Sequence, residues 1–142
     1  MSTILHVVDV AVSPKEVFAA ISTLDGLRHW WTEKVDGDEQ EGGTIRFAFV
    51  PGLFNPEMRI DELEEPTSLV WRCVAGAEQW TDATIAFDLE ERDEGTRLVF
   101  RQTYGQPLDD LSFGIYNFNW GYYLESLRLH CEKGEGKPFQ PH

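Results

Sequence analysis

The stretch DLSFGIYNFNWGYYLESLRLHCEK, residues 110–133, decides the fold of this chain. Large apolar side chains recur along it at the period of an α-helix, so we expect one long amphipathic helix with a single inward-facing stripe. Gly134 follows directly, and a glycine at this position typically ends a helix. The tail beyond it is polar, and we expect it to be mobile at residues 140–142. The predicted stripe consists of Phe113, Asn117, Trp120, Leu124, Leu127 and Cys131.

Upstream of this helix, between Gly42 and Tyr104, apolar residues alternate with polar ones, which is typical of β-strands. Turn residues such as Pro51-Gly52 divide the segment into short pieces. A sheet of alternating strands has one apolar face, and the long helix carries the longest apolar stripe available to cover it. We therefore expect an α+β fold in which an antiparallel meander packs on the last helix. The expected strands lie at residues 45–49, 58–61, 69–74, 84–89 and 98–104.

The N-terminal segment predicts a strand followed by two helices. Residues 3–12 are rich in β-branched side chains and indicate an opening strand. The Ser13 hydroxyl can then cap a helix start, and Pro14 suits the first helical position because its missing N–H has no partner there. We expect this helix to stop near Gly26. A second short helix at residues 27–32 should cover one end of the domain with Leu27, Trp30 and Trp31.

Composition places the chain among acidic globular proteins. Its 142 residues and 42% hydrophobic content suit a single domain, residues 1–142. A net charge of -13 repels phosphate backbones and anionic lipids, which argues against nucleic acid and membrane surfaces as partners. No apolar run is long enough to span a membrane and the start lacks signal-peptide features, so we expect a cytoplasmic location. Cys73 and Cys131 lie within apolar patterns, which favours two reduced thiols.

The abundance of aromatic residues, with five Trp, nine Phe and four Tyr, allows two interpretations. Large rings often line ligand cavities, but they can equally fill the space between a sheet and a helix. Asn117 bears on this choice because its place in the stripe turns an amide toward the apolar interior, where an unpaired amide would cost about 1–3 kcal/mol. Either a neighbouring backbone group satisfies this amide, or a ligand or a cavity water does.

A small-molecule site follows from the second interpretation. Gln102 and Tyr104 lie on the apolar face of the last strand, opposite Asn117, and these three residues would orient an amphipathic ligand. The apolar walls would be Phe47, Phe49, Met58, Trp71, Phe87, Phe100 and Trp120. The sequence contains no Gly-x-Ser-x-Gly elbow and no phosphate-binding glycine loop, and its four histidines lie far apart. We therefore assign no catalytic residue and expect neither a metal nor a covalent cofactor.

Several passages, in this order and spacing, resemble one known family. They are VSPKEVF at residues 12–18, GLRHWW at 26–31, Gly42-Gly43, TIAFDL at 84–89 with GTRL at 95–98, and NWG at 119–121. The chain resembles the START-like, or SRPBCC, superfamily, in the branch named after the C-terminal domain of the activator of the ninety-kilodalton heat-shock protein ATPase. This resemblance implies a helix-grip fold, in which a curved antiparallel sheet wraps the last helix around a cavity for apolar or amphipathic small molecules.

The resemblance leaves three functions open. The first is a binding module for a small apolar or amphipathic molecule, which the candidate site favours and which requires no catalysis. The second is an enzyme that uses the same cavity, a cyclase or dehydratase of a polyketide-like substrate, acting mainly by shaping a reactive chain. The third is an interaction module that stimulates a chaperone ATPase, with a chaperone as partner. Separately, exposed edge strands of the sheet allow a homodimer.

Overall fold

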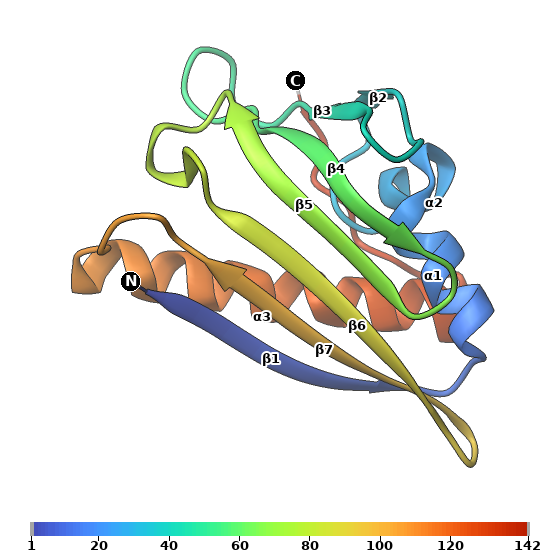
Figure 1. Cartoon of the computed structure of the whole chain (residues 1–142). Helices are drawn as coiled ribbons and strands as arrows, with labels where there is room; N and C mark the ends of the chain where they lie inside the picture. Colours follow the sequence, from blue (N-terminus) through green and yellow to red (C-terminus); the bar gives the residue numbers. More distant parts are fainter. Residues whose placement is uncertain (1, 142) are drawn as a thin grey trace.

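The computed structural model describes residues 2–141, and within them seven antiparallel strands form one sheet with its helices on one face (Figure 1). In chain order the elements are β1 (Thr3–Val10), α1 (Pro14–Ser22), α2 (Leu24–Arg28), β2 (Val35–Gly37), β3 (Thr44–Phe47), β4 (Glu57–Glu64), β5 (Ser68–Ala75), the short 3₁₀ helix η1 (Glu78–Trp80), β6 (Thr84–Arg92), β7 (Gly95–Thr103) and α3 (Asp110–Lys133). The sheet order is β1-β7-β6-β5-β4-β3-β2. The long helix α3 packs on the curved sheet, which confirms the helix-grip fold.

Alternation in the sequence placed the strands from β3 to β7 correctly. In β6 and β7 the inward residues pair across the ladder, and Phe87 lies directly opposite Phe100 with both rings buried. The strand β2 was not expected, because three residues are too few to show an alternating pattern. Pairing with β3 holds it as an edge strand of the sheet, where Val35 lies opposite Phe47.

The boundary between the first two helices differs from the expected one. Ser13 accepts a hydrogen bond from the Glu16 amide at 3.3 Å, as its capping role predicts, but α1 already ends at Ser22. Thr23 then caps the start of α2 by accepting from the amide of Gly26, which lies inside that helix. A β-carbon on Gly26 would come within 2.5 Å of the Ala19 carbonyl oxygen. The glycine therefore permits close helix–helix contact and does not end α1.

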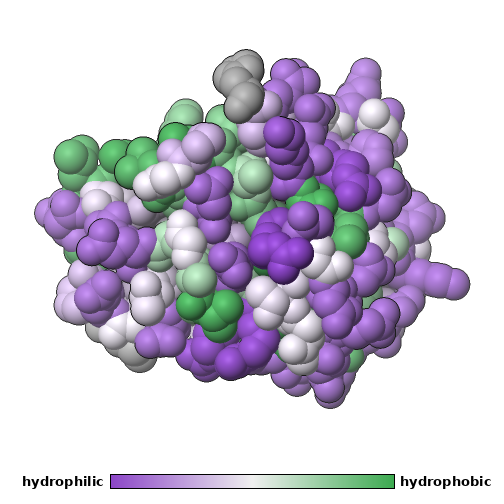
Figure 2. All heavy atoms as spheres, turned by 90° about the horizontal axis from the view of Figure 1, so that it is seen from above, coloured by the Kyte–Doolittle hydropathy of each residue, from purple (hydrophilic) through white to green (hydrophobic). Residues whose placement is uncertain are grey.

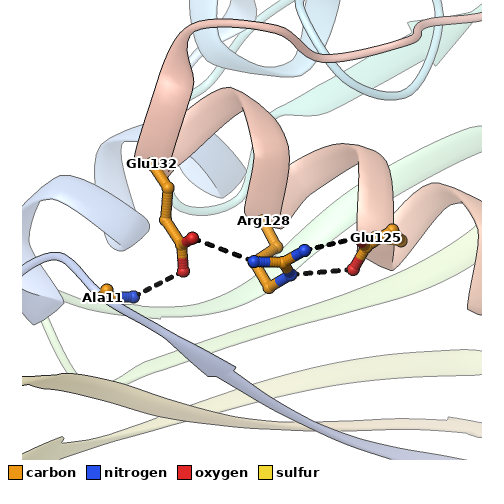
Figure 3. Close-up of polar contacts among 4 residues, drawn as sticks. All are labelled: Ala11, Glu125, Arg128 and Glu132. Carbon is orange, nitrogen blue, oxygen red and sulfur yellow. Dashed lines mark hydrogen bonds and ion pairs between the residues drawn. The ribbon is translucent and has the colours of Figure 1, made fainter.

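The second half of α3 is anchored to the start of the chain by an ion-pair network (Figure 3). Arg128 lies between Glu125 and Glu132 and bonds to both carboxylates. Glu132 in turn accepts a hydrogen bond of 2.8 Å from the amide of Ala11, at the end of β1. Gly134 then takes a left-handed conformation with φ of 68°, which confirms its role as the helix end. Neither α3 nor any other helix within residues 2–141 is long and apolar enough to cross a membrane.

The tail after α3 folds back onto the molecule. The Lys137 amide donates to the Ser126 hydroxyl at 2.6 Å, and Phe139 pairs with the segment around Thr32 through two backbone hydrogen bonds. Gln140 donates to Glu33 at 3.3 Å. We expected residues 140–142 to be mobile, but Gln140 makes this defined contact with Glu33. His142 lies outside the described residues.

Candidate ligand-binding cleft

Two loops at one end of the sheet are locked to each other, and together they position part of the candidate site. Asn55 accepts from the amide of Phe49 and donates to the carbonyl of Val50, both at 2.8 Å, which closes the loop between β3 and β4. The backbone N–H of Asn55 donates to the carbonyl of Gly76 in the loop between β5 and β6. Gly76 has φ of 86°, and a β-carbon there would lie 1.8 Å from the Asn55 carbonyl oxygen. Only glycine fits, so the two loops hold one fixed relation.

A cleft of about 680 Å³ opens between these loops, the middle of α3 and the C-terminal tail. This volume falls in the usual range for small-molecule sites, about 300–1,000 Å³. The walls are mainly aromatic, with a few amide and carboxylate groups between the rings. They comprise Trp31, Phe49, Val50, Leu53, Phe54, Ala77, Glu78, Gln79, Trp80, Tyr116, Asn119, Trp120, Tyr123 and Phe139.

Trp31 forms the inner end of the cleft and is the centre of the aromatic core. Its ring centroid lies 4.4 Å from that of Phe47 and 5.1 Å from that of Trp120. It also stacks on Trp71 and Trp80, with interplanar angles of 14° and 13°. The sequence suggested that Trp31 covers one end of the domain, whereas the structure places it between sheet and α3. Trp31 therefore fills much of the space that was expected to be hollow.

The predicted apolar walls separate into two groups. Phe49 and Trp120 line the cleft. The others, Phe47, Met58, Trp71, Phe87 and Phe100, are fully buried and pack into the core beneath it. The lining residues of the two loops, such as Phe54 and Trp80, were missed because loops have no periodic pattern. Large rings within turn segments are the signal that could have identified them.

Asn117 was assigned the wrong direction, since its side chain is exposed and does not line the cleft. Tyr116, one residue earlier, takes the inward place, and Asn119 supplies the amide that borders the cleft. On a helix, neighbouring residues are about 100° apart, so Tyr116 and Asn117 lie on opposite flanks of the direction in which Trp120 points. The cleft lies on the Tyr116 side.

Gln102 and Tyr104 do face α3, as predicted, but Gln102 meets Trp120 and Tyr104 stacks on Tyr116, in place of the expected Asn117. The Gln102 side-chain oxygen accepts hydrogen bonds of 2.7 Å from the Trp120 indole N–H and from the Tyr104 hydroxyl. Because an indole N–H can only donate, this contact fixes the orientation of the amide. The Gln102 Nε2 atom is buried and has no hydrogen-bond partner among the described residues. Burial strongly raises the pKa of Tyr104, so its phenol stays protonated.

Two further tyrosines border the cleft as neutral hydrogen-bonding groups. Burial raises the pKa of Tyr116 and of Tyr123, so both phenols remain protonated at neutral pH. The Tyr116 hydroxyl donates to the Gln79 side-chain oxygen at 2.6 Å, and Gln79 donates to Ser112 at 3.1 Å. Within residues 2–141, no group of three His, Cys, Asp or Glu side chains is arranged to hold a metal ion. The site is therefore an aromatic cleft with neutral hydrogen-bonding groups and the Glu78 carboxylate in its wall.

The curved sheet, the long helix across it and the cleft between them define a START-like, helix-grip protein. The chain belongs to the family described as Activator of Hsp90 ATPase homolog 1-like protein, whose model matches residues 11–132. Among curated proteins, no sequence matches this chain.

Solved structures show the same fold. The Aha1 dimer from Colwellia psychrerythraea is 28% identical, with a TM-score of 0.85 over 96% of this chain and 100% of that chain. CalU16 from Micromonospora echinospora is 21% identical, with a TM-score of 0.75 over 95% of this chain and 76% of that chain. DynU16, a putative protein in the dynemicin biosynthetic locus, is 17% identical, with a TM-score of 0.79 over 95% of this chain and 49% of that chain.

Proposed function

We propose that this chain, as a single domain of residues 1–142, binds a small apolar or amphipathic molecule in the aromatic cleft beside α3. The observation that carries the proposal is the cleft itself: a volume of about 680 Å³ walled by rings from two loops, α3 and the tail. Aromatic walls favour a ligand with a flat or extended apolar part. Asn119 and Gln79 add neutral polar groups at the wall, which suit a ligand that also carries a hydroxyl or a carbonyl.

The proposed site contains fewer of the predicted ligand contacts than the sequence suggested. Phe49 and Trp120 keep the role of ligand contacts, whereas Gln102 and Tyr104 act from behind by fixing Trp120. The remaining predicted walls, Phe47, Met58, Trp71, Phe87 and Phe100, support the lining rings from the core. Asn119 takes the place of Asn117 as the α3 side-chain amide in the cleft wall.

Titration with Nile red, a neutral dye whose emission rises in apolar surroundings, tests the proposal. Leu53 at the rim of the cleft is 76% exposed, so Leu53→Asp should fold normally while placing a charge at the cleft mouth. We expect about tenfold weaker dye binding, because the substitution removes an aliphatic contact at the rim and places a carboxylate beside an apolar ligand. Leu5→Asp is the matched control, because Leu5 is 51% exposed on β1 and does not line the cleft. Equal binding by wild type and both variants, or no binding at all, would refute the cleft as the site.

The other two functions are distinguished by what accompanies the protein. Native mass spectrometry of the chain purified from its own host would reveal a retained small molecule, and turnover of that molecule would support the cyclase or dehydratase alternative. Stimulation of ATP hydrolysis by the host's ninety-kilodalton heat-shock protein would support the chaperone alternative, which the family description suggests. A retained molecule that is neither converted nor needed for ATPase stimulation supports the binding function alone.

We also propose that the chain self-associates into a homodimer. The Colwellia psychrerythraea relative, which this chain matches over its whole length, is described as a dimer. Sedimentation velocity at increasing protein concentration tests this, and a sedimentation coefficient that stays at the monomer value throughout would contradict it.

A further inference from the structure

The first half of α3 exposes a row of large apolar side chains on its outer face, the side turned away from the sheet. Leu111 and Phe118 are each 75% exposed, and Ile115 and Tyr122 are about half exposed. These four residues are spaced so that they lie along one line of a helix, and we call them the outer stripe. Figure 2 shows exposed apolar surface gathered at the left of the view, the side on which α3 begins in Figure 1. Much of the remaining visible surface is hydrophilic.

The outer stripe lies in a part of the helix without any charge. Between Asp110 and Glu125 no Asp, Glu, Lys or Arg occurs, although 26% of the whole chain is charged. A surface helix normally carries charged residues on the face turned to water. For a chain with a net charge of -13, a second copy is repelled by most of the surface, but along the outer stripe it meets a like charge only at Asp110, at the start of the helix.

Gly114 lies beside the outer stripe and is not required by the chain's own packing. A β-carbon at this position would meet no atom within 4 Å, so alanine would fit the folded chain. Glycine inside a helix destabilises it relative to alanine. A small residue on an exposed helix face, however, lets another helix cross at a short distance.

We propose that a second copy of this chain packs its own α3 against the outer stripe, around a two-fold axis close to Ile115 and Phe118. This assignment rests on the proposed self-association and gives it a surface. In a two-fold interface each residue occurs twice, so the two copies of the stripe face each other. From Leu111 to Tyr122 the stripe is about 17 Å long, which is short for the roughly 800 Å² that a stable interface covers on each partner. The dimer is therefore weak and depends on protein concentration.

The same interface lies beside the ligand cleft. Asn119 borders the cleft on one side and a shallow groove with Leu111, Ile115 and Phe118 on the other. The ring of Tyr122 lies edge-on to that of Tyr123, a cleft residue, at a centroid distance of 5.1 Å. A partner seated on the outer stripe thus neighbours the cleft mouth, and ligand and dimer should influence each other.

Sedimentation equilibrium of the whole chain and three variants tests this assignment. Phe118→Asp brings two carboxylates together near the axis, and we expect the dissociation constant of the dimer to rise about a hundredfold. Val7→Asp is the control, since Val7 is an exposed apolar residue on β1, outside the outer stripe, and the dissociation constant of this variant should not change. Gly114→Ala should raise the melting temperature of the monomer while weakening the dimer, two effects of opposite sign that a folding defect would not produce.

The possible outcomes distinguish an error in the location of the interface from an error in the proposed self-association. A dimer that survives Phe118→Asp but is lost in Val7→Asp would overturn the assignment and favour pairing through the β1 edge. A dimer that survives both variants overturns the assignment of the interface to α3 but leaves the proposed self-association intact. A wild-type chain that stays monomeric over about two decades of concentration overturns both proposals. If that monomer also sediments with phosphatidylcholine vesicles, the outer stripe belongs to a lipid surface instead.

Discussion

Both halves of α3 bury apolar side chains against the rest of the protein, but their outer faces are very different. In residues 125–133 the outer side carries charged groups, and Arg128 and Glu132 connect the helix to Ala11 at the end of β1. In residues 111–124 the inner side shapes the cleft, while the outer side is uncharged and exposed. One half of the helix is thus anchored by polar contacts, which leaves the other half available for binding.

The largest effect should come from removing the ring that joins the first half to the core. Trp120→Ala deletes a buried indole and leaves the Gln102 oxygen with one donor fewer, and we expect a loss of about 3–5 kcal/mol in the free energy of unfolding. Phe118→Ala, two residues away on the outer face, should change it by less than about 0.5 kcal/mol. Urea denaturation at low protein concentration measures both. Similar losses for the two variants would remove the distinction between the inner and outer faces.

A medium effect is expected where the second half is fastened to the tail. The Ser126 hydroxyl is buried, donates to the Trp30 carbonyl at 2.9 Å and accepts from the Lys137 amide at 2.6 Å. Ser126→Ala leaves both backbone groups without this partner, so we expect a loss of about 1–3 kcal/mol and faster hydrogen exchange at Phe139. If exchange at Phe139 is unchanged, the tail is held by other contacts.

The ion pairs of the second half should contribute least to stability. Arg128→Gln is expected to lower the free energy of unfolding only slightly at low salt, because these pairs are partly exposed and screened. Arg128 holds the pKa of Glu125 below its ordinary value. A carboxylate with a lowered pKa stabilises the fold above its unfolded pKa of about 4.3, and this contribution disappears as the pH falls through the folded value.

Melting curves of the wild type and Arg128→Gln at neutral and acid pH measure this effect. The gap between the two melting temperatures should close toward low pH. A gap that stays constant from neutral to acid pH would show that Arg128 acts through packing.

The smallest effect concerns a thiol at the end of the second half, and it leaves stability unchanged. Burial, with the nearby carboxylates of Glu16 and Glu132, raises the pKa of Cys131 to about 12, and burial also raises the pKa of Cys73. Both thiols are therefore protonated at pH 8 and should react with iodoacetamide much more slowly in the folded chain than in urea. Mass spectrometry of timed reactions measures this. Rapid labelling of Cys131 in the folded chain would show that this end of α3 opens.

Local signals in the sequence predicted much of the fold, because a cap or an alternating strand depends only on neighbouring residues. The caps at Ser13 and Gly134 were identified in this way. The position of Trp31 was not, because it depends on partners in four distant elements. The direction of Asn117 failed for another reason: helical spacing shows that a stripe exists, but locates its centre only to within about one residue.

The candidate site was predicted in part for the same reason. Phe49 and Trp120 extend regular patterns, so their inward direction could be inferred. Glu78 and Gln79 belong to a loop whose course depends on the contact between Gly76 and Asn55. Such a contact between separate loops leaves no periodic trace in the sequence.

The docking of Phe139 has a practical consequence for anyone who handles this protein. Its ring is part of the cleft wall, with its centroid 5.3 Å from that of Phe49. Deleting residues 135–141 would therefore remove one wall of the pocket that a ligand screen sets out to probe.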